Sequence, residues 1–271
     1  MIIDTHCHLN KNEYNNLEEV VKNLDNFIVI NSGIDTETNE MVIDLANKYK
    51  NFYATIGYHP ENIDNLEDNY IKLLEEKLSN EKVVAIGEIG LDYHWRQDNK
   101  EKQKEVFINQ LKLALKYNKP VVVHSRDAVQ DTYDILKEYR VKADIHCYAS
   151  SVEMAKEFIK LGCLIGVGGT VTFKNASKIA DVVRAIDLEN ILLETDSPYL
   201  APEPVRGTKN IPNNTKYIIE KTGQIKGIDK ESVICTLNNN AIKFRILAED
   251  RLINSQYIII GNNLYNLIFN F

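Results

Sequence analysis

Short apolar runs of strand length alternate with helical segments along most of this 271-residue chain, and this alternation limits the folds that it can adopt. Eight such strand–helix pairs fit within about 245 residues, which suits an α/β chain closed into a (β/α)8 TIM barrel. A doubly wound open sheet is the competing architecture. We expect the barrel, because polar residues that end several apolar runs would then converge on one axis, where barrels build their active sites.

The predicted elements follow from the spacing of apolar residues. The first predicted strand opens at Ile2, and the others cover 27–34, 52–58, 83–89, 120–124, 143–146, 163–167 and 191–196. The predicted helices cover 17–24, 36–50, 66–78, 101–117, 128–139, 152–161, 176–186, 215–222 and 231–245. No linker or repeat interrupts the series, so residues 1–248 are predicted to form one domain. Residues 249–271 are an extension of unknown role, in which 257–260 and 264–268 are predicted to pair as a hairpin through 261–263.

The charge balance excludes one class of function. The chain has 32 basic and 39 acidic residues, a net charge of −7, and lacks the clustered cationic face that long duplex DNA requires. Any nucleic-acid contact must therefore be local, with metal ions supplying positive charge. The four cysteines form no C-x-x-C pair, which is typical of a reduced, cytoplasmic protein. We expect no signal peptide and no membrane span, and the pattern indicates no obligate protein partner.

Two histidines stand two residues apart in the first predicted strand, within the segment Asp4-Thr5-His6-Cys7-His8. Side chains alternate along a strand, so His6 and His8 face the same side, about 7 Å apart along the chain, and can close on one metal ion. A His-x-His pair alone is a weak signal. It is strengthened here by further candidate ligands, each at the end of its own apolar run, which are Glu88, His124, His146 and Asp196.

These six side chains exceed the needs of one ion. A closed tetrahedral site takes four ligands and a catalytic one usually three, whereas six ligands with one bridging carboxylate suit two divalent ions about 4 Å apart. We predict Glu88 as the bridge, because its strand lies between the two histidine groups. The predicted ligands are His6, His8 and Asp196 for one ion and His124 and His146 for the other. Asp196 would also act as general base toward a bridging water.

The identity of the metal stays open. Four imidazoles favour Zn²⁺, Mn²⁺ or Fe²⁺, whereas Mg²⁺ prefers an oxygen shell. The site can bind one ion most tightly and work with another.

Three residues near the strand ends are candidates to contact a phosphate. His59 ends the third predicted strand and is placed to touch a substrate phosphate or the leaving oxygen. Arg126 shares a strand face with His124 and can clamp a phosphate with two hydrogen bonds. Arg206 lies after the last predicted strand, where barrels often bind phosphate. The alternative for His59 is a structural histidine, that for Arg126 is a structural ion pair, and that for Arg206 is a solvated loop charge.

Three more residues belong to the loop after the fourth predicted strand. Asp92 lies on the same strand face as Glu88, so it is a candidate partner for a ligand histidine. Tyr93 and Trp95 are candidates to stack on nucleic-acid bases, with ordinary packing as the alternative.

Six segments, taken in order, resemble the TatD family of metal-dependent deoxyribonucleases, a branch of the amidohydrolase-like TIM barrels. They are DTHCH at 4–8, GYHP at 57–60, GEIGLDY at 87–93, VHSRD at 123–127, IHCY at 145–148 and ETDSPYL at 194–200. The resemblance covers about residues 1–248. It implies a (β/α)8 barrel with two divalent ions on the same six ligands. It also implies a cytoplasmic enzyme that hydrolyses DNA, often from the 3′ end of single strands.

The chain departs from the family pattern at two places. The family commonly has Arg-Gly-x-x-Asn-Glu-Pro after the eighth strand, whereas Ile211 stands here where Glu is usual. The segment 250–271 also extends beyond the usual end of the family.

Two other functions stay open. The enzyme could be an amidohydrolase or esterase acting on a small molecule, since barrels with this ligand set also hydrolyse amides and lactones. Many of those bridge their ions with a carboxylated lysine, whereas the fourth strand here offers Glu88, which favours the nuclease. A non-catalytic, metal-stabilised barrel is the third reading, and the intact set of six ligands argues against it.

Overall fold

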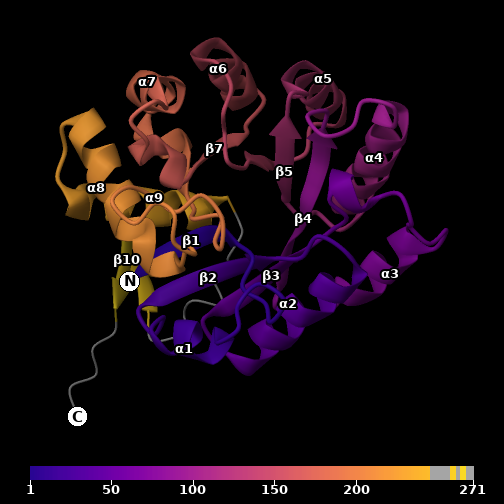
Figure 1. Ribbon diagram of the computed structural model, residues 1–271, viewed down its shortest axis with the longest axis horizontal. Helices are drawn as coiled ribbons and strands as arrows, with labels where there is room; N and C mark the ends of the chain where they lie inside the picture. Colours follow the sequence, from indigo (N-terminus) through magenta and orange to yellow (C-terminus); the bar gives the residue numbers. More distant parts are fainter. Residues whose placement is uncertain (245–256, 261–262, 267–271) are drawn as a thin grey trace.

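The computed structural model of the protein describes residues 1–244, 257–260 and 263–266. Eight parallel strands stand side by side in the order β1 to β8 and curve into a barrel (Figure 1). They are β1 (Ile2–Cys7), β2 (Phe27–Ser32), β3 (Phe52–Ile56), β4 (Val83–Asp92), β5 (Val121–Arg126), β6 (Ala143–Ile145), β7 (Leu164–Val167) and β8 (Ile191–Leu193). The chain after β8 closes the barrel against β1, because the backbone N–H of Asp196 donates to His6 O at 3.0 Å. The predicted (β/α)8 barrel is confirmed.

Helices follow the strands and surround them (Figure 1). They are α1 (Leu17–Lys22), α2 (Thr36–Lys48), α3 (Tyr70–Lys77), α4 (Lys100–Lys116), α5 (Val129–Tyr139), α6 (Val152–Lys160), α7 (Ser177–Ala185), α8 (Thr215–Lys226) and α9 (Lys230–Lys243). Several begin at a residue whose side chain accepts a hydrogen bond from an otherwise free N–H of the first turn. Asp35 caps α2 in this way, Ser151 caps α6 and Asp229 caps α9.

Alternate residues of the strands divide between two apolar clusters. Val29 belongs to the larger cluster, between the strands and the surrounding helices, whereas its neighbours Ile28 and Ile30 belong to a smaller one that includes residues of α9. This period of two is expected of strands buried on both faces. The side chain of Asn238 in α9 accepts a hydrogen bond from the N–H of Ile3 at 3.0 Å. Helix α9 thus covers the barrel end at which β1 begins, and the opposite end holds the polar residues.

The structure moves several predicted boundaries. β4 continues past its predicted end at Ile89, so Glu88, which was predicted to end this strand, lies within it. β8 ends at Leu193, and Asp196 follows the strand rather than ending it. Helix α3 begins at Tyr70 instead of residue 66, because the apolar residues before it pack without forming helix. The predicted end of the last helix at residue 245 lies outside the described residues.

β4 is longer than predicted because it remains paired with β5 beyond an irregularity in the register. After that shift, Gly90 pairs with His124 and Asp92 pairs with Arg126. Gly90 has φ of 140°, and a Cβ there would lie 2.0 Å from His124 O, so only glycine fits. The extension carries Asp92 and Arg126 together to the open end of the barrel.

The tail forms a second, two-stranded sheet. β9 (Tyr257–Ile260) and β10 (Asn263–Asn266) pair antiparallel, with Asn263 opposite Ile260, which confirms the pairing of the predicted hairpin. Strand β10 contacts α9. Residues 261–262 and 267–268 of that prediction, and the domain boundary at residue 248, lie outside the described residues. Within the described ranges, no helix combines the length and apolar character needed to cross a membrane.

Candidate metal centre

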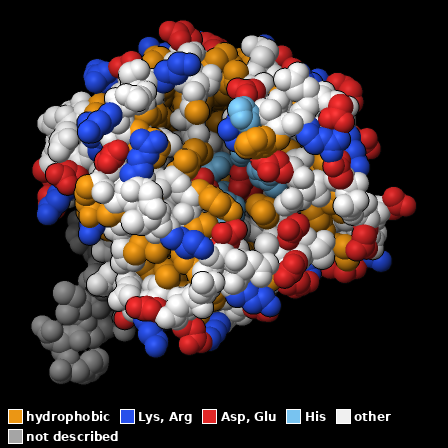
Figure 2. All heavy atoms as spheres, in the orientation of Figure 1, with side chains coloured by type: hydrophobic (Ala, Val, Ile, Leu, Met, Phe, Trp, Pro, Cys, Tyr) orange, Lys and Arg blue, Asp and Glu red, His pale blue; other side chains and the backbone are white. Residues whose placement is uncertain are grey.

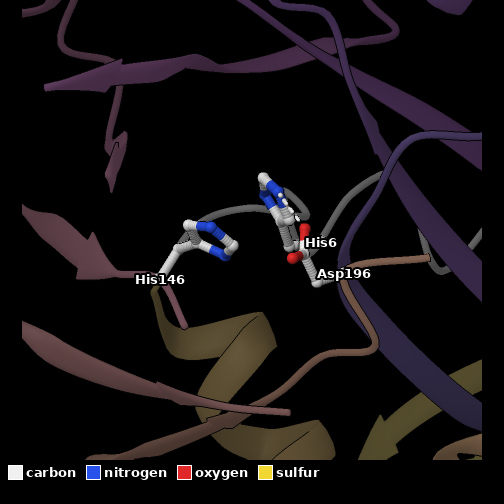
Figure 3. Close-up of side chains that lie close together, drawn as sticks. All are labelled: His6, His146 and Asp196. Carbon is white, nitrogen blue, oxygen red and sulfur yellow. Dashed lines mark ion pairs between the residues drawn. The ribbon is translucent and has the colours of Figure 1, made fainter. Parts of the chain in front are cut away.

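Strand β1 brings two imidazoles to one point inside the barrel. His6 lies in the strand and His8 follows it, both are buried, and their Nε2 atoms are 3.1 Å apart. Figure 2 shows histidine and acidic side chains at the floor of a hollow in one face of the molecule. Figure 3 shows His146 pointing toward His6 and Asp196. Residues far apart in the chain therefore share this hollow, as the sequence predicted.

Four atoms at this point are spaced as the ligands of one ion would be. The Nε2 atoms of His6 and His8 lie 3.3 and 3.2 Å from Glu88 Oε2, and each lies 3.5 Å from Asp196 Oδ1. Ligand atoms bound tetrahedrally at about 2.0–2.1 Å from a zinc ion lie about 3.4 Å from one another. The group therefore fits a divalent ion, and its two nitrogens and two oxygens suit Zn²⁺ or Mn²⁺.

A second group faces the other oxygen of the same carboxylate. His124 Nδ1 lies 3.0 Å from Glu88 Oε1, and His146 Nε2 lies 3.4 Å from it. His59 Nε2 is 3.3 Å from the same oxygen. The two oxygens of Glu88 thus face different imidazoles, which suits a bridging carboxylate. The ring centroids of His6 and His146, from the two sets, lie 3.9 Å apart, so His146 also groups with His6 and Asp196. The number of ions and their ligands stay predictions.

His8 and His124 each make a hydrogen bond on the side of the ring that faces away from Glu88. These hydrogen bonds show which ring nitrogen is available as a ligand. His8 Nδ1 lies 3.0 Å from Ser32 O, and a carbonyl only accepts, so Nδ1 carries the proton and Nε2 presents its lone pair to the group. His124 Nε2 lies 2.8 Å from Asp92 Oδ2, which places the proton on Nε2 and turns the Nδ1 lone pair toward Glu88. The expected partnership of Asp92 with a ligand histidine is present. A proton on the second nitrogen would satisfy each of these contacts with a carboxylate, and a bound divalent cation would take the place of that proton.

His59 differs from the other histidines in the position of its proton. Its Nδ1 accepts a hydrogen bond from the backbone N–H of Glu61 at 3.2 Å, so the proton is on Nε2, which points at Glu88 Oε1. Burial lowers the pKa of His59, and the neighbouring His124 lowers it further, so the ring is neutral at pH 7. His59 therefore offers an N–H donor to the site, which agrees with a contact to a phosphate or leaving oxygen better than with metal ligation.

The carboxylates of the centre and His8 have pKa values that the groups around them shift toward the charged forms. Burial lowers the pKa of His8, but Asp196 and Glu88 outweigh this and raise it to about 10. Burial raises the pKa of Asp196, and His6 and His8 overcome it and hold that pKa well below its usual range. Glu88 behaves in the same way, with His146 and His59 among the opposing groups. Both carboxylates are thus ionised at neutral pH.

A layer of buried acids lies beneath the centre, and the sequence analysis missed it. Glu194 Oε1 accepts a hydrogen bond from the N–H of Cys147 at 2.6 Å and lies 3.5 Å from His146 Nδ1. Glu194 Oε2 and both carboxyl oxygens of Asp144 are buried with no hydrogen-bond partner among the described residues. Gly166 leaves room for this layer, since a Cβ there would lie 2.5 Å from Glu194 Oε2. The alternation of side chains along a strand could have revealed these acids. Each stands two residues before a candidate ligand, so each faces the same side as that ligand.

In protein from which metal has been removed by a chelator, Asp144→Asn is expected to raise the free energy of unfolding, and this increase should grow with pH. Burial raises the pKa of Asp144 well above its usual value, and the Glu194 carboxylate adds to the effect. A carboxyl with a raised pKa in the folded state binds more protons there, so the wild-type free energy of unfolding falls as pH rises above the unfolded pKa of about 3.9. Asparagine does not titrate, so the difference in free energy of unfolding between Asp144→Asn and the wild type should widen by up to about 1.4 kcal/mol per pH unit.

Urea unfolding of both proteins between pH 4 and pH 8 measures this gap. Asp134→Asn, on the exposed face of α5, is the matched control and should show a gap that does not grow with pH. A gap between wild type and Asp144→Asn that stays constant or narrows would contradict the buried-carboxyl interpretation.

The predicted substrate residues have different surroundings. Tyr93 is 5% exposed, and its hydroxyl donates to Asp131 Oδ2 at 2.8 Å, which favours the packing alternative over stacking on bases. It is held by packing between β4 and α5. Trp95 is exposed, and Arg126 lies over its ring. The Arg206 guanidinium lies 4.2 Å from the centroid of the Phe173 ring, and its role stays a prediction.

Comparison with known proteins adds independent information. A sequence model of the family described as TatD related DNase matches residues 3–245. The chain is 40% identical over 256 residues to an uncharacterized metal-dependent hydrolase, YabD, of Bacillus subtilis (strain 168), covering 91% of this chain and 100% of that protein. It is 35% identical over 259 residues to YcfH of Escherichia coli (strain K12), also described as an uncharacterized metal-dependent hydrolase, with 90% and 96% covered. The crystal structure of YjjV, a TatD homolog from Escherichia coli K12, superposes with a TM-score of 0.84 at 30% identity, covering 91% of this chain and 98% of that one.

Proposed function

This chain belongs to the TatD family of metal-dependent hydrolases, and on that basis we propose that it hydrolyses DNA phosphodiester bonds, removing nucleotides from the 3′ ends of single strands. The proposal rests mainly on the position of Glu88, whose two carboxylate oxygens face different histidines. His6 and His8 face one of its oxygens, and His124 and His146 face the other. Two divalent ions held in this way suit in-line displacement at phosphorus, where charge develops on attacking and leaving oxygens together.

The side chains around the centre supply the remaining chemistry. Divalent ions held here would polarise a phosphoryl oxygen and lower the pKa of a water. Asp196 is ionised at neutral pH, and its Oδ1 faces His6 and His8, which leaves Oδ2 to accept a proton as general base. His59 directs its Nε2–H into the same cluster and would donate to the substrate or to the leaving oxygen.

His59→Ala is expected to lower kcat about 100-fold while leaving the metal content unchanged, because it removes a hydrogen-bond donor rather than a ligand. His124→Ala, in contrast, should lower the metal content. Elemental analysis of each purified variant and kcat on a single-stranded oligonucleotide measure both effects. Asp134→Ala, on the exposed face of α5, is the control and should change neither quantity. Loss of metal from His59→Ala equal to that from His124→Ala would make His59 a ligand and contradict this assignment.

The proposed function is tested by cleavage of 3′-labelled and 5′-labelled single-stranded oligonucleotides. The protein is first stripped of metal, and Mg²⁺, Mn²⁺ and Zn²⁺ are then added back separately. Stepwise shortening from the 3′ end with one or more ions is the expected result. No shortening with any ion, together with faster turnover of small amides, lactones or esters, would overturn the nuclease in favour of a small-molecule hydrolase.

We also propose a cytoplasmic location. Cys7 and Cys163 are buried as free thiols in the barrel, and burial raises the pKa of Cys163 to about 12, so these sulfurs are unreactive core residues that need no oxidising compartment.

A further inference from the structure

Trp95 is a large aromatic side chain left in solvent beside the metal centre. It is 64% exposed and is the single tryptophan of the chain. A single exposed apolar residue is ordinary on a protein surface, but tryptophan is enriched at binding interfaces because its apolar ring carries a polar N–H. Its backbone N–H lies 3.4 Å from Asp92 Oδ1, and the other oxygen of Asp92 holds His124. One carboxylate therefore ties the position of this ring to that of a candidate metal ligand.

Arg126 is the second member of this surface. It ends β5, two residues after His124, and its guanidinium carbon lies 5.3 Å from the centroid of the Trp95 ring. Within the described part of the chain, no carboxylate lies within ion-pair distance of Arg126. The neighbouring Arg96, by comparison, pairs with both Asp64 and Asp98. A guanidinium that is exposed, stacked on a ring and without an acidic partner keeps its edge N–H groups available for a phosphate.

The space next to the ring accommodates a ligand. A pocket of about 190 Å³ adjoins Trp95, and its other lining residues are Pro60, Glu61, Asp92, Arg96, Asn99 and Gln103. Two of its lining residues adjoin the metal centre, since Pro60 follows His59 in the chain and Asp92 Oδ2 lies 2.8 Å from His124 Nε2. A ligand in this pocket would contact the Trp95 ring, and Arg126, which does not line the pocket, lies over the same ring.

We propose that Trp95 and Arg126 form a subsite for one unpaired nucleotide next to the bond to be cleaved, with the base stacked on Trp95 and a phosphate held by Arg126. The inference rests on the proposed nuclease function. It adds where the nucleotide binds and the requirement that its base be unpaired. Stacking on an aromatic ring tolerates every base but needs a free base face, which a duplex does not provide. The subsite therefore selects single strands over duplex DNA by stacking rather than by sequence.

Because Trp95 is the single tryptophan, its fluorescence reports on this subsite directly. The probe is an eight-residue thymidine strand with phosphorothioate linkages, which resist hydrolysis, titrated into the metal-loaded protein. A saturable quench is expected. A strand of the same length with abasic residues and a duplex of the same sequence should each quench less than half as much. Equal signals from the thymidine and abasic strands, or no quench by the thymidine strand, would overturn the subsite.

Variants separate stacking from general structural effects. Trp95→Ala is expected to raise KM for a cleavable single strand about 10-fold, with the smaller part of the change in kcat, and Trp95→Phe should recover most of the loss. Arg126→Ala should also raise KM and reduce the slope of log KM against log salt by about one unit. Leu115→Ala removes an exposed apolar side chain from α4 and should change neither constant.

The outcomes distinguish this inference from the function on which it rests. Quenching by single strands without any DNA hydrolysis would keep the subsite and remove the nuclease. Hydrolysis of single strands with the same KM in wild type and Trp95→Ala would keep the nuclease and remove the subsite.

Discussion

Glu88→Gln is expected to lower DNA hydrolysis at least about 1,000-fold while leaving the barrel folded. Glutamine has the shape of glutamate, but its amide presents N–H groups to one of the two sets of imidazoles and carries no charge. Glu88 Oε2 lies 3.2–3.3 Å from two imidazole nitrogens, and Oε1 lies 3.0–3.4 Å from three more. This substitution therefore disturbs both groups of the centre at once, whereas other single substitutions remove one ligand from one group.

The loss is measured as kcat/KM on a fluorescent single-stranded oligonucleotide, with metal content and far-ultraviolet circular dichroism recorded on the same samples. Glu138→Gln makes the same chemical change on the exposed face of α5 and should leave all three unchanged. Hydrolysis retained within 10-fold by a folded Glu88→Gln variant would show that Glu88 does not bridge two ions. The two-ion interpretation of the site would then be wrong.

Removal of metal is expected to abolish hydrolysis and to lower the melting temperature by about 5–10 °C. An ion that binds only the folded state stabilises it by about 2.7 kcal/mol at a concentration 100 times its Kd. For a chain of this size, each 1 kcal/mol corresponds to about 2–4 °C. Stabilisation is expected because the ion would neutralise Glu88, which is buried, and Asp196, which is partly buried, and both carboxylates lie within 3.5 Å of His6 Nε2.

Differential scanning calorimetry after chelation, with single ions added back, gives the shift, and elemental analysis gives the stoichiometry. Two ions per chain are expected, with Zn²⁺ or Mn²⁺ giving the larger shift because the imidazoles outnumber the carboxylates. Glu88→Gln provides the control, since it should lose most of the shift. One ion per chain at saturation would limit the centre to the His6 and His8 group and assign the second group to substrate binding.

Much of the fold is readable from local pattern. The type of an element follows from the spacing of its own buried residues. The alternation around Val29 and the apolar runs before His124 and His146 therefore indicate strands, even when the neighbouring strands are unknown. The order of eight such units then favours a barrel. The candidate ligands were found for the same reason, because a polar residue at the end of an apolar run is a local feature.

Other properties depend on the distances between strands. The longer β4 arises from pairing with β5 after a register shift, and that pairing carries Trp95 to the open end while it buries Tyr93 against Asp131. Both aromatic residues have the same local context, so no pattern within the chain separates the exposed ring from the buried one. The contact of Asp131 with Tyr93 joins residues 38 positions apart.

The sequence by itself determined the barrel and the set of candidate ligands, because strand period and residue type are encoded within a few neighbouring positions. Only the tertiary structure decided which oxygen of Glu88 faces which imidazoles, and that His59 carries its proton on Nε2. It also decided that Asp144 and Glu194 lie buried beneath His146. These features depend on atoms that different strands bring together, and barrel closure and strand register set their separations to within a few tenths of an ångström.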